Sequence, residues 1–129
     1  MVKFGYTILY VDNVENSIAF YENAFGFSRK FVTPENDYGE LITGETTISF
    51  ASKKLANQNL KEGFLESNLT NKPFGIEIGL ITDDVPETVQ KATSFGAVLV
   101  AEPIEKPWGQ IVAYVRDPDG FLVEICTEI

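Results

Sequence analysis

Apolar residues recur at helical spacing in two segments of the chain. The apolar stripe of the first segment is Val14, Ile18, Tyr21 and Phe25, and that of the second is Val85, Val89 and Ala92. Because residues three or four apart share one face of a helix, each segment is predicted to be an amphipathic helix. A cap at Asp12, with Glu15 three residues later, begins the first helix, and Gly26 ends it. The second helix tolerates Pro86 in its first turn and stops at Gly96.

Strand-like segments, rich in β-branched and aromatic residues, surround each predicted helix. One strand precedes each helix and three follow it, so the order βαβββ occurs twice. The predicted strands cover 3–11, 27–33, 38–43 and 45–52, and then 75–82, 97–103, 109–116 and 120–128. The pattern predicts an α+β fold of two tandem βαβββ modules, in which a curved mixed sheet surrounds a concave cavity and the helices cover the outer face.

The two halves also repeat each other in sequence. Residues 11–18 reappear as residues 82–89, at an offset of 71 positions. The whole chain has the length of one ordinary domain, whereas each half alone would be marginally stable. We therefore predict a single domain over 1–129, with one module at about 1–52, a surface linker at about 53–74 and the second module at about 75–129. A short helical turn near Leu55–Leu60 is expected within the linker.

The charge of the chain restricts its partners. Nineteen acidic and ten basic residues give a net charge of −9, which repels phosphate backbones and anionic lipid, so neither nucleic acid nor a membrane is an expected partner. No apolar stretch approaches the roughly 20 residues of a membrane span, and no signal-peptide pattern opens the sequence, so a cytoplasmic location is predicted. Cys126, the single cysteine, lies in an apolar strand and is expected to be a buried, inert thiol.

Alternation along two predicted strands places two glutamates on one face. Successive side chains of a strand point to opposite sides of the sheet, and the purely aliphatic rows are expected to face the helix. Glu77 and Glu124 then lie on the opposite, concave face, in runs too apolar for ordinary surface carboxylates. A carboxylate in such a place needs a partner or has a raised pKa. The internal repeat equates these two positions with Tyr6 and Ser49.

Four sequence motifs lie in the paired modules, three in the first module and one in the second. They are Tyr10-Val11-Asp12-Asn13-Val14, Ser17-Ile18-Ala19-Phe20-Tyr21, Phe25-Gly26-Phe27 and Asp117-Pro118-Asp119-Gly120-Phe121-Leu122-Val123-Glu124. Together with the module order, they resemble the vicinal oxygen chelate superfamily, which contains glyoxalase I, bleomycin-resistance proteins, fosfomycin-resistance enzymes and extradiol dioxygenases. The resemblance covers nearly the whole chain outside the linker, and it specifies the fold more closely than the reaction.

The resemblance also implies a set of ligand positions. Metal-dependent members carry His, Gln or Glu at the position of Tyr6, Glu or another ligand near Ser49, His or Glu at Glu77, and Glu at Glu124. This chain departs from that pattern at the first two positions, and it contains no histidine. Because zinc, nickel and iron favour imidazole or thiolate, we expect no transition-metal cofactor. The alternative is Mg²⁺ or Mn²⁺, held by the two glutamates, the two hydroxyls and several waters.

The residues and the resemblance together favour a small-molecule binding or sequestering protein of the glyoxalase and bleomycin-resistance type. The two glutamates favour a cationic ligand, and four aromatic residues offer surfaces for stacking or cation–π contacts: Tyr6, Tyr38, Trp108 and Tyr114. Ser49 is a further candidate ligand-binding residue. Trp108 also has a purely structural interpretation as the plug of a turn. The alternative function is a metal-dependent, glyoxalase-like lyase or isomerase, in which Glu124 or Glu77 ligates the ion or moves a proton next to a carbonyl.

The sequence also allows a purely structural role for the two glutamates. In that case they form a polar pair that is bound to neighbouring hydroxyls or to Arg116. Which face of the strand at 109–116 meets the cavity also stays open, because the row with Gln110 and Tyr114 and the row with Ile111 and Ala113 are both suitable.

A homodimer is the predicted assembly. Relatives in the superfamily commonly dimerise, and half-sized modules with exposed sheet edges give a physical reason for pairing. If modules pair across chains, Tyr6 and Ser49 of one subunit share a cavity with Glu77 and Glu124 of the other.

Overall fold

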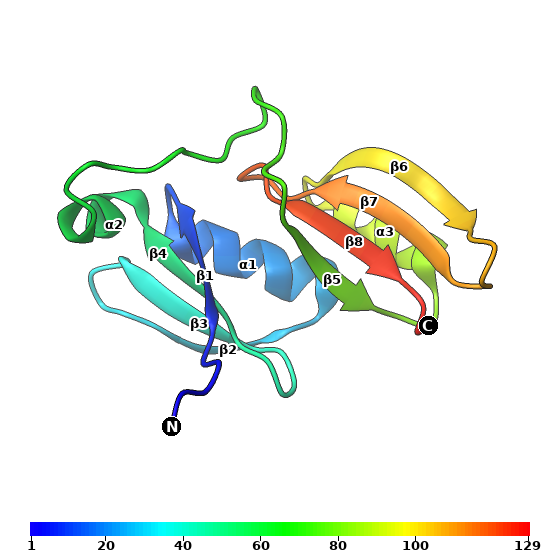
Figure 1. Cartoon of the computed structure of the whole chain (residues 1–129), viewed down its shortest axis with the longest axis horizontal. Coiled ribbons are helices and arrows are strands. Elements are labelled where there is room, and N and C mark those ends of the chain that lie inside the picture. The colour runs from blue at the N-terminus through cyan, green and yellow to red at the C-terminus, as the bar shows by residue number, and fades with distance from the viewer. The chain divides into compact units, whose positions relative to one another are not determined.

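The elements of the computed structural model follow the predicted order in each half of the chain (Figure 1). All residues from 1 to 129 are described, and they form two units, Met1–Glu66 and Ser67–Ile129. The first unit contains β1 (Thr7–Val11), α1 (Val14–Phe25), β2 (Ser28–Val32), β3 (Tyr38–Ile42), β4 (Ile48–Ser52) and α2 (Lys53–Asn59). The second contains β5 (Glu77–Ile81), α3 (Val85–Ser94), β6 (Val98–Glu105), β7 (Ile111–Arg116) and β8 (Leu122–Cys126). No helix is long and apolar enough to cross a bilayer.

Each module forms its own four-stranded mixed sheet with the same strand order. The first sheet has the order β1-β4-β3-β2 and the second has the order β5-β8-β7-β6. In each, the strand before the helix pairs in parallel with the last strand of the module, and the other pairs are antiparallel. The predicted α+β class and the tandem βαβββ modules are therefore confirmed.

The cap of the first helix is one residue later than predicted, at Asn13 instead of Asp12. The Asn13 side chain, and not that of Asp12, accepts the hydrogen bond from the Asn16 N–H at 3.0 Å. Asp12 instead forms an ion pair with Lys53, with 3.2 Å between Oδ1 and Nζ. The prediction was wrong because consecutive Asp and Asn residues are equally good caps, and the sequence does not say which side chain turns inward. The helix ends at Gly26 with a φ of 77°, as predicted.

The predicted apolar stripe of α1 forms the core of the first unit. Val14, Ile18 and Tyr21 are fully buried, and the Tyr21 ring packs on Phe50 of β4 with 5.4 Å between ring centroids. Gly39 of β3 lies directly under the helix, since a Cβ there would be 2.5 Å from Ile18 Cδ1. Phe50 and Gly39 thus mark the face of the first sheet that α1 covers.

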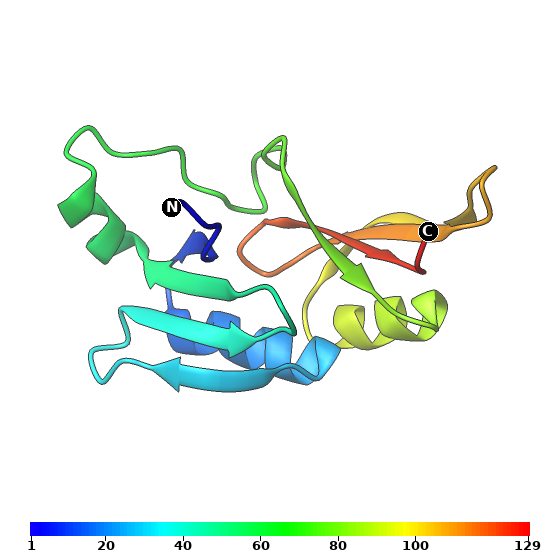
Figure 2. The ribbon, with the colours of Figure 1, turned by 60° about the horizontal axis from the view of Figure 1, so that its bottom comes forward.

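The second unit repeats this packing with α3. The Asp84 side chain caps the helix by accepting from the Glu87 N–H at 3.0 Å, and Pro86 occupies the first turn as predicted. Figure 2 shows α3 along one face of the second sheet, where it packs on β6, β7 and β8. Its predicted stripe is buried, as are Val123 and Ile125 of β8.

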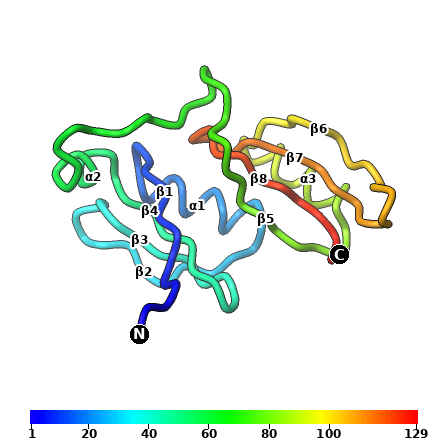
Figure 3. The backbone as a smooth tube through the Cα atoms, viewed as in Figure 1, coloured from blue at the N-terminus to red at the C-terminus, as the bar shows by residue number.

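The segment predicted to be a surface linker contains a helix close to the helical turn predicted near residues 55–60. Its first part is α2, which Ser52 caps by accepting from the Leu55 N–H at 3.0 Å. From α2 to β5 the backbone contains neither helix nor strand (Figure 3). Residues 68–71 are nevertheless fixed, because the buried Arg116 guanidinium donates to the carbonyl oxygens of Asn68 at 2.9 Å and Asn71 at 2.7 Å.

Candidate functional site

On the second sheet, Glu77 and Glu124 lie on the same face. Gly79 of β5 is the register partner of Glu124 on β8, and Glu77 is two residues before Gly79, so the three positions point to one side. Val123 and Ile125, which alternate with Glu124, are fully buried on the other side, which faces α3. A Cβ at Gly79 would be 3.7 Å from Glu124 Oε1, so this glycine keeps the space beside the carboxylate free of side-chain atoms.

Tyr114 of β7 lies directly opposite Glu124 and anchors it. The Tyr114 hydroxyl donates to Glu124 Oε2 at 3.1 Å. Loss of hydration and the bond to the carboxylate raise the pKa of Tyr114, so the phenol keeps its proton at neutral pH. The question of which face of β7 meets the glutamates is thereby answered, because the row that contains Tyr114 lies beside them.

Glu77 is exposed, which corrects the expectation that both glutamates are embedded in the sheet. Its pKa is nevertheless raised, first because the carboxylate loses part of its hydration against the sheet, and second because the negative charge of Glu124 is near. The strand β5 lies at the edge of its sheet, so an acid on it reaches solvent even though its neighbours are apolar. Two carboxylates on one face therefore repel each other, and Glu124 is the half-buried member of the pair.

A chain of polar contacts continues from Glu124 to the β6–β7 turn. Cys126 is buried, as expected, and its burial and the neighbouring Glu124 raise the pKa of its thiol to about 11. The Gln110 side chain contacts the Cys126 thiol, and its amide N–H donates to the Thr127 carbonyl oxygen at 2.9 Å. It also accepts from the Trp108 indole N–H at 2.9 Å. Trp108 is thus held in the turn by its indole N–H, and the residue is 63% exposed.

On the first sheet, the positions equivalent to the two glutamates are Tyr6 and Ser49. Tyr6 precedes β1, which begins at Thr7 rather than at residue 3, and it is half exposed. Ser49 alternates with Phe50 and Glu40 alternates with Gly39, so both point away from α1.

Glu40 and Ser49 face each other across β3 and β4. The Tyr38 hydroxyl donates to Glu40 Oε2 at 2.6 Å, and Lys30 Nζ lies 3.6 Å from Glu40 Oε1. Loss of hydration, followed by the bond to Glu40, raises the pKa of Tyr38 to about 12, although the nearby Ser49 hydroxyl acts in the opposite direction. Ser49 Oγ is fully buried and forms no hydrogen bond of normal geometry.

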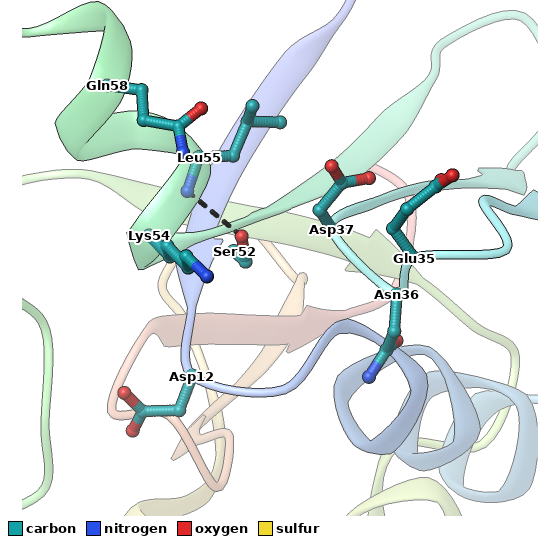
Figure 4. A pocket seen from close by; sticks show the side chains of 8 residues that line it. All are labelled: Asp12, Glu35, Asn36, Asp37, Ser52, Lys54, Leu55 and Gln58. Carbon is teal, nitrogen blue, oxygen red and sulfur yellow. Dashed lines mark hydrogen bonds between the residues drawn. The ribbon is translucent and has the colours of Figure 1, made fainter.

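A separate pocket of about 390 Å³ lies in the first unit, where β1 and β4 end (Figure 4). Asp12 follows β1, Ser52 ends β4, and the turn between β2 and β3 contributes residues 35–37. Figure 4 shows Lys54, Leu55 and Gln58 of α2 on its other side. None of the predicted ligand-binding residues lines this pocket, and it is open and polar.

The donor set does not fit a transition metal. In the second unit the candidate donors are two carboxylates, a protonated phenol and a thiol with a pKa of about 11, whereas zinc, nickel and iron favour imidazole or thiolate. In the first unit the equivalent positions supply hydroxyls. No group of three or more Cys, Asp, Glu or His side chains is arranged to hold a metal ion.

The two modules have the same strand order, and each carries polar residues on the sheet face that points away from its helix. These features define a duplicated βαβββ protein of the class that the sequence resembles. The chain belongs to the Glyoxalase/Bleomycin resistance protein/Dioxygenase superfamily, whose model matches residues 3–125.

Relatives and solved structures agree with this family. The chain is 27% identical over 128 residues to a putative lactoylglutathione lyase of Brassica oleracea var. gemmifera, a match that covers 95% of this chain but only 43% of that protein. It is 27% identical over 126 residues to a probable lactoylglutathione lyase of Synechocystis sp., covering 93% of this chain and 91% of that one. A glyoxalase-related enzyme from Fulvimarina pelagi has the same fold, with a TM-score of 0.83, 18% identity, and coverage of 99% and 89%. The chain thus spans less than half the length of the plant relative.

Sequence reasoning missed Glu40, and it named Gln110 only as a member of one of the two possible rows of the strand at 109–116. Glu40 lies between Gly39 and Leu41 in a strand, which is the same signal of an acid in an apolar run that identified Glu124. Gln110 carried no comparable signal, because its part depends on three contacts that only the folded turn creates.

Proposed function

We propose that this protein binds or sequesters a small cationic or aromatic molecule, as a member of the glyoxalase and bleomycin-resistance type without an intact transition-metal site. The observation that carries this proposal is the face of the second sheet, where Glu77 and Glu124 lie together and Gly79 leaves space between the strands. Loss of hydration, followed by the negative charge of Glu124, raises the pKa of Glu77, and a cation placed there relieves the second of these effects. Tyr114 holds Glu124 in place, so the carboxylate pays little rotamer entropy on binding.

Aromatic side chains near this face support a ligand with a flat apolar part. Trp108 exposes its ring and is held by Gln110, which also lies on Cys126 next to Glu124. Tyr114 adds a second ring beside the carboxylate. A cation with an attached ring gains both charge-assisted hydrogen bonds and cation–π or stacking contacts. On the first unit, Tyr6 and Ser49 are the proposed counterparts.

The experiment is a calorimetric titration with benzamidinium and with benzamide, its neutral isostere. We expect the cation to bind at least tenfold more tightly, because a hydrogen bond to a charged group contributes about 1.5–3 kcal/mol and each 1.4 kcal/mol is about tenfold in affinity. Glu124→Gln should weaken benzamidinium by about tenfold. The matched control is Glu102→Gln on the exposed strand β6, which removes the same charge elsewhere. Equal affinities for the two probes, or equal losses in the two variants, would contradict the proposal.

A second candidate function is a metal-assisted lyase or isomerase of the glyoxalase type. It is favoured by the names of the relatives and by Glu77, whose raised pKa suits a general base that takes a proton next to a carbonyl. The carboxylate and hydroxyl oxygens of the candidate site fit Mg²⁺ or Mn²⁺ better than zinc. Dialysis against each ion, followed by metal analysis and an assay of hemithioacetal isomerisation, tests it. Stoichiometric uptake with turnover lost in Glu77→Gln is the result that this function requires.

We also propose that the protein is a homodimer. Both outer strands of each sheet are unpaired edges, and strand β6 exposes Val98, Val100 and Ile104. Sedimentation equilibrium at micromolar concentration should give twice the chain mass of 14.3 kDa. A mass of one chain would exclude the dimer at that concentration.

A further inference from the structure

The two modules carry the same polar pair in exchanged positions. In the second module the cross-strand pair is Tyr114 on β7 and Glu124 on β8, and in the first it is Glu40 on β3 and Ser49 on β4. Each pair thus contains one carboxylate and one hydroxyl on directly opposite residues. The acid that the repeat leads one to expect at Ser49 is therefore present on the neighbouring strand.

Each carboxylate is also anchored in the same way. Glu124 accepts from the Tyr114 hydroxyl at 3.1 Å, and Glu40 accepts from the Tyr38 hydroxyl at 2.6 Å. Tyr38 comes from the same strand as its glutamate, whereas Tyr114 comes from the strand opposite. The halves have thus kept a tyrosine-held glutamate on the face away from the helix while changing the positions that supply it.

The pair on the first unit has acceptor capacity that the protein does not use. Oε1 of Glu40 has only Lys30 near it, at 3.6 Å, and the Lys30 side chain is 60% exposed, so this ion pair is weak. Ser49 Oγ is completely buried and forms no hydrogen bond of normal geometry, although the Tyr38 hydroxyl is near it, and this is a costly state for a hydroxyl. Opposite residues of an antiparallel pair have Cβ atoms about 4.5–5.5 Å apart, so one ligand group can reach both side chains.

We infer that Glu40 and Ser49 form a cation-binding subsite on the first unit, which takes a planar nitrogen cation with two N–H donors, such as an amidinium. This inference rests on the proposed function, because it names the residues and the ligand group for the same kind of binding. One N–H of the ligand donates to Glu40 Oε1 and the other to Ser49 Oγ. Since Ser49 is fully covered in the free chain, a flanking side chain turns aside when the ligand enters.

The subsite should select ligands that carry N–H donors. Tyr38 keeps its proton and already donates to Glu40, so the position offers acceptors and little room for an anionic or acceptor-only group. A fork of two N–H groups matches two acceptors on adjacent strands, whereas a quaternary ammonium, which has no N–H, does not. Benzamidinium should therefore bind here, and benzyltrimethylammonium should not.

The test is benzamidinium titration of the full chain, followed by amide chemical shifts and by calorimetry. We expect shifts in β3 and β4, and Glu40→Gln should remove them and weaken the probe at this subsite by about tenfold. Glu45→Gln, in the exposed turn between these strands, is the matched control and should change neither. Ser49→Ala should weaken the probe without lowering the unfolding temperature, since the hydroxyl has no hydrogen bond of normal geometry to lose.

Two results would overturn the inference. One is an unchanged set of β3 and β4 shifts in Glu40→Gln. The other is a Ser49→Ala protein whose unfolding temperature falls by several degrees while its affinity stays the same, which would make Ser49 a structural residue. Shifts confined to β7 and β8 that depend on Glu124 would leave the proposed function standing while removing this subsite. Loss of all binding to amidinium would remove both.

Discussion

Replacing Arg116 by methionine should destabilise the second unit. The guanidinium donates to three backbone carbonyl oxygens, those of Gly120 at 2.9 Å, Asn71 at 2.7 Å and Asn68 at 2.9 Å, and the residue is only 9% exposed. Methionine keeps most of the aliphatic stem and removes every donor, so the change isolates the hydrogen bonds from the packing. The segment at 68–71 then loses its hydrogen bonds to Arg116, whereas the neighbouring bond from Ser67 Oγ to the Asp119 carbonyl oxygen, at 2.9 Å, remains.

The size of the effect follows from those three bonds. A net hydrogen bond is worth about 1 kcal/mol, so the sum is about 3 kcal/mol. Against this, methionine removes the cost of burying a charge, and the carbonyls of Asn68 and Asn71 can be hydrated once the segment moves. We therefore expect a loss of about 2 kcal/mol, which for a chain of this size lowers the unfolding temperature by roughly 6–10 °C.

The assay is thermal and denaturant unfolding followed by circular dichroism, with hydrogen exchange of residues 68–71 as a local measurement. Arg116→Lys should lie between the wild type and methionine, because an ammonium group cannot reach all three acceptors in the fork geometry. Lys72→Met is the control, since this neighbouring lysine is exposed and should change stability by less than about 0.5 kcal/mol. A methionine variant that is as stable as the wild type, or more stable, would show that desolvation outweighs the bonds.

Three further predictions concern other parts of the chain. Gly39→Ala should destabilise the first unit by about 1–3 kcal/mol in denaturant unfolding, because the new methyl would lie 2.5 Å from Ile18 Cδ1, and an unchanged midpoint would mean that α1 shifts freely. Glu77 has a raised pKa in the folded state, so its contribution to stability is fully present below its unfolded pKa near 4.5 and is lost as the pH rises through the folded value. Glu77→Gln should therefore be slightly more stable than the wild type at pH 7 and equal to it below about pH 4, with a difference under roughly 0.5 kcal/mol because solvent screens the charge. Cys126, which is buried with a pKa of about 11, should react with a disulfide reagent far more slowly in the native protein than in guanidinium chloride, and equal rates would show that β8 frays.

Much of the fold follows from periodicity in the sequence. The stripe from Val14 to Phe25 and its copy around Val89 predicted both long helices, because helical spacing of apolar residues reports burial directly. Strand positions were also correct, but their ends were not, and β1 begins four residues after the predicted start at residue 3. Strand ends depend on where the partner strand stops, which no local pattern contains.

The candidate site was predictable only in part. Alternation correctly placed Glu77 and Glu124 on one face, yet it did not reveal that Glu77 is exposed, because exposure depends on the position of β5 at the sheet edge. Of the two partners named for a structural role of the glutamates, a neighbouring hydroxyl is the one that holds Glu124, because Tyr114 donates to it, whereas Arg116 donates to backbone carbonyls. Glu40 was overlooked because a repeat compares equivalent positions only, and the acid had moved to an adjacent strand.

Trp108 gives this protein a built-in optical probe of one half. It is the single tryptophan of the chain and lies in the second unit, with its indole N–H bound to Gln110. Selective excitation therefore reads out unfolding of Ser67–Ile129 alone, whereas far-ultraviolet ellipticity reports both halves. Whether the two signals change at one denaturant concentration reveals directly if the duplicated halves melt as a single cooperative entity.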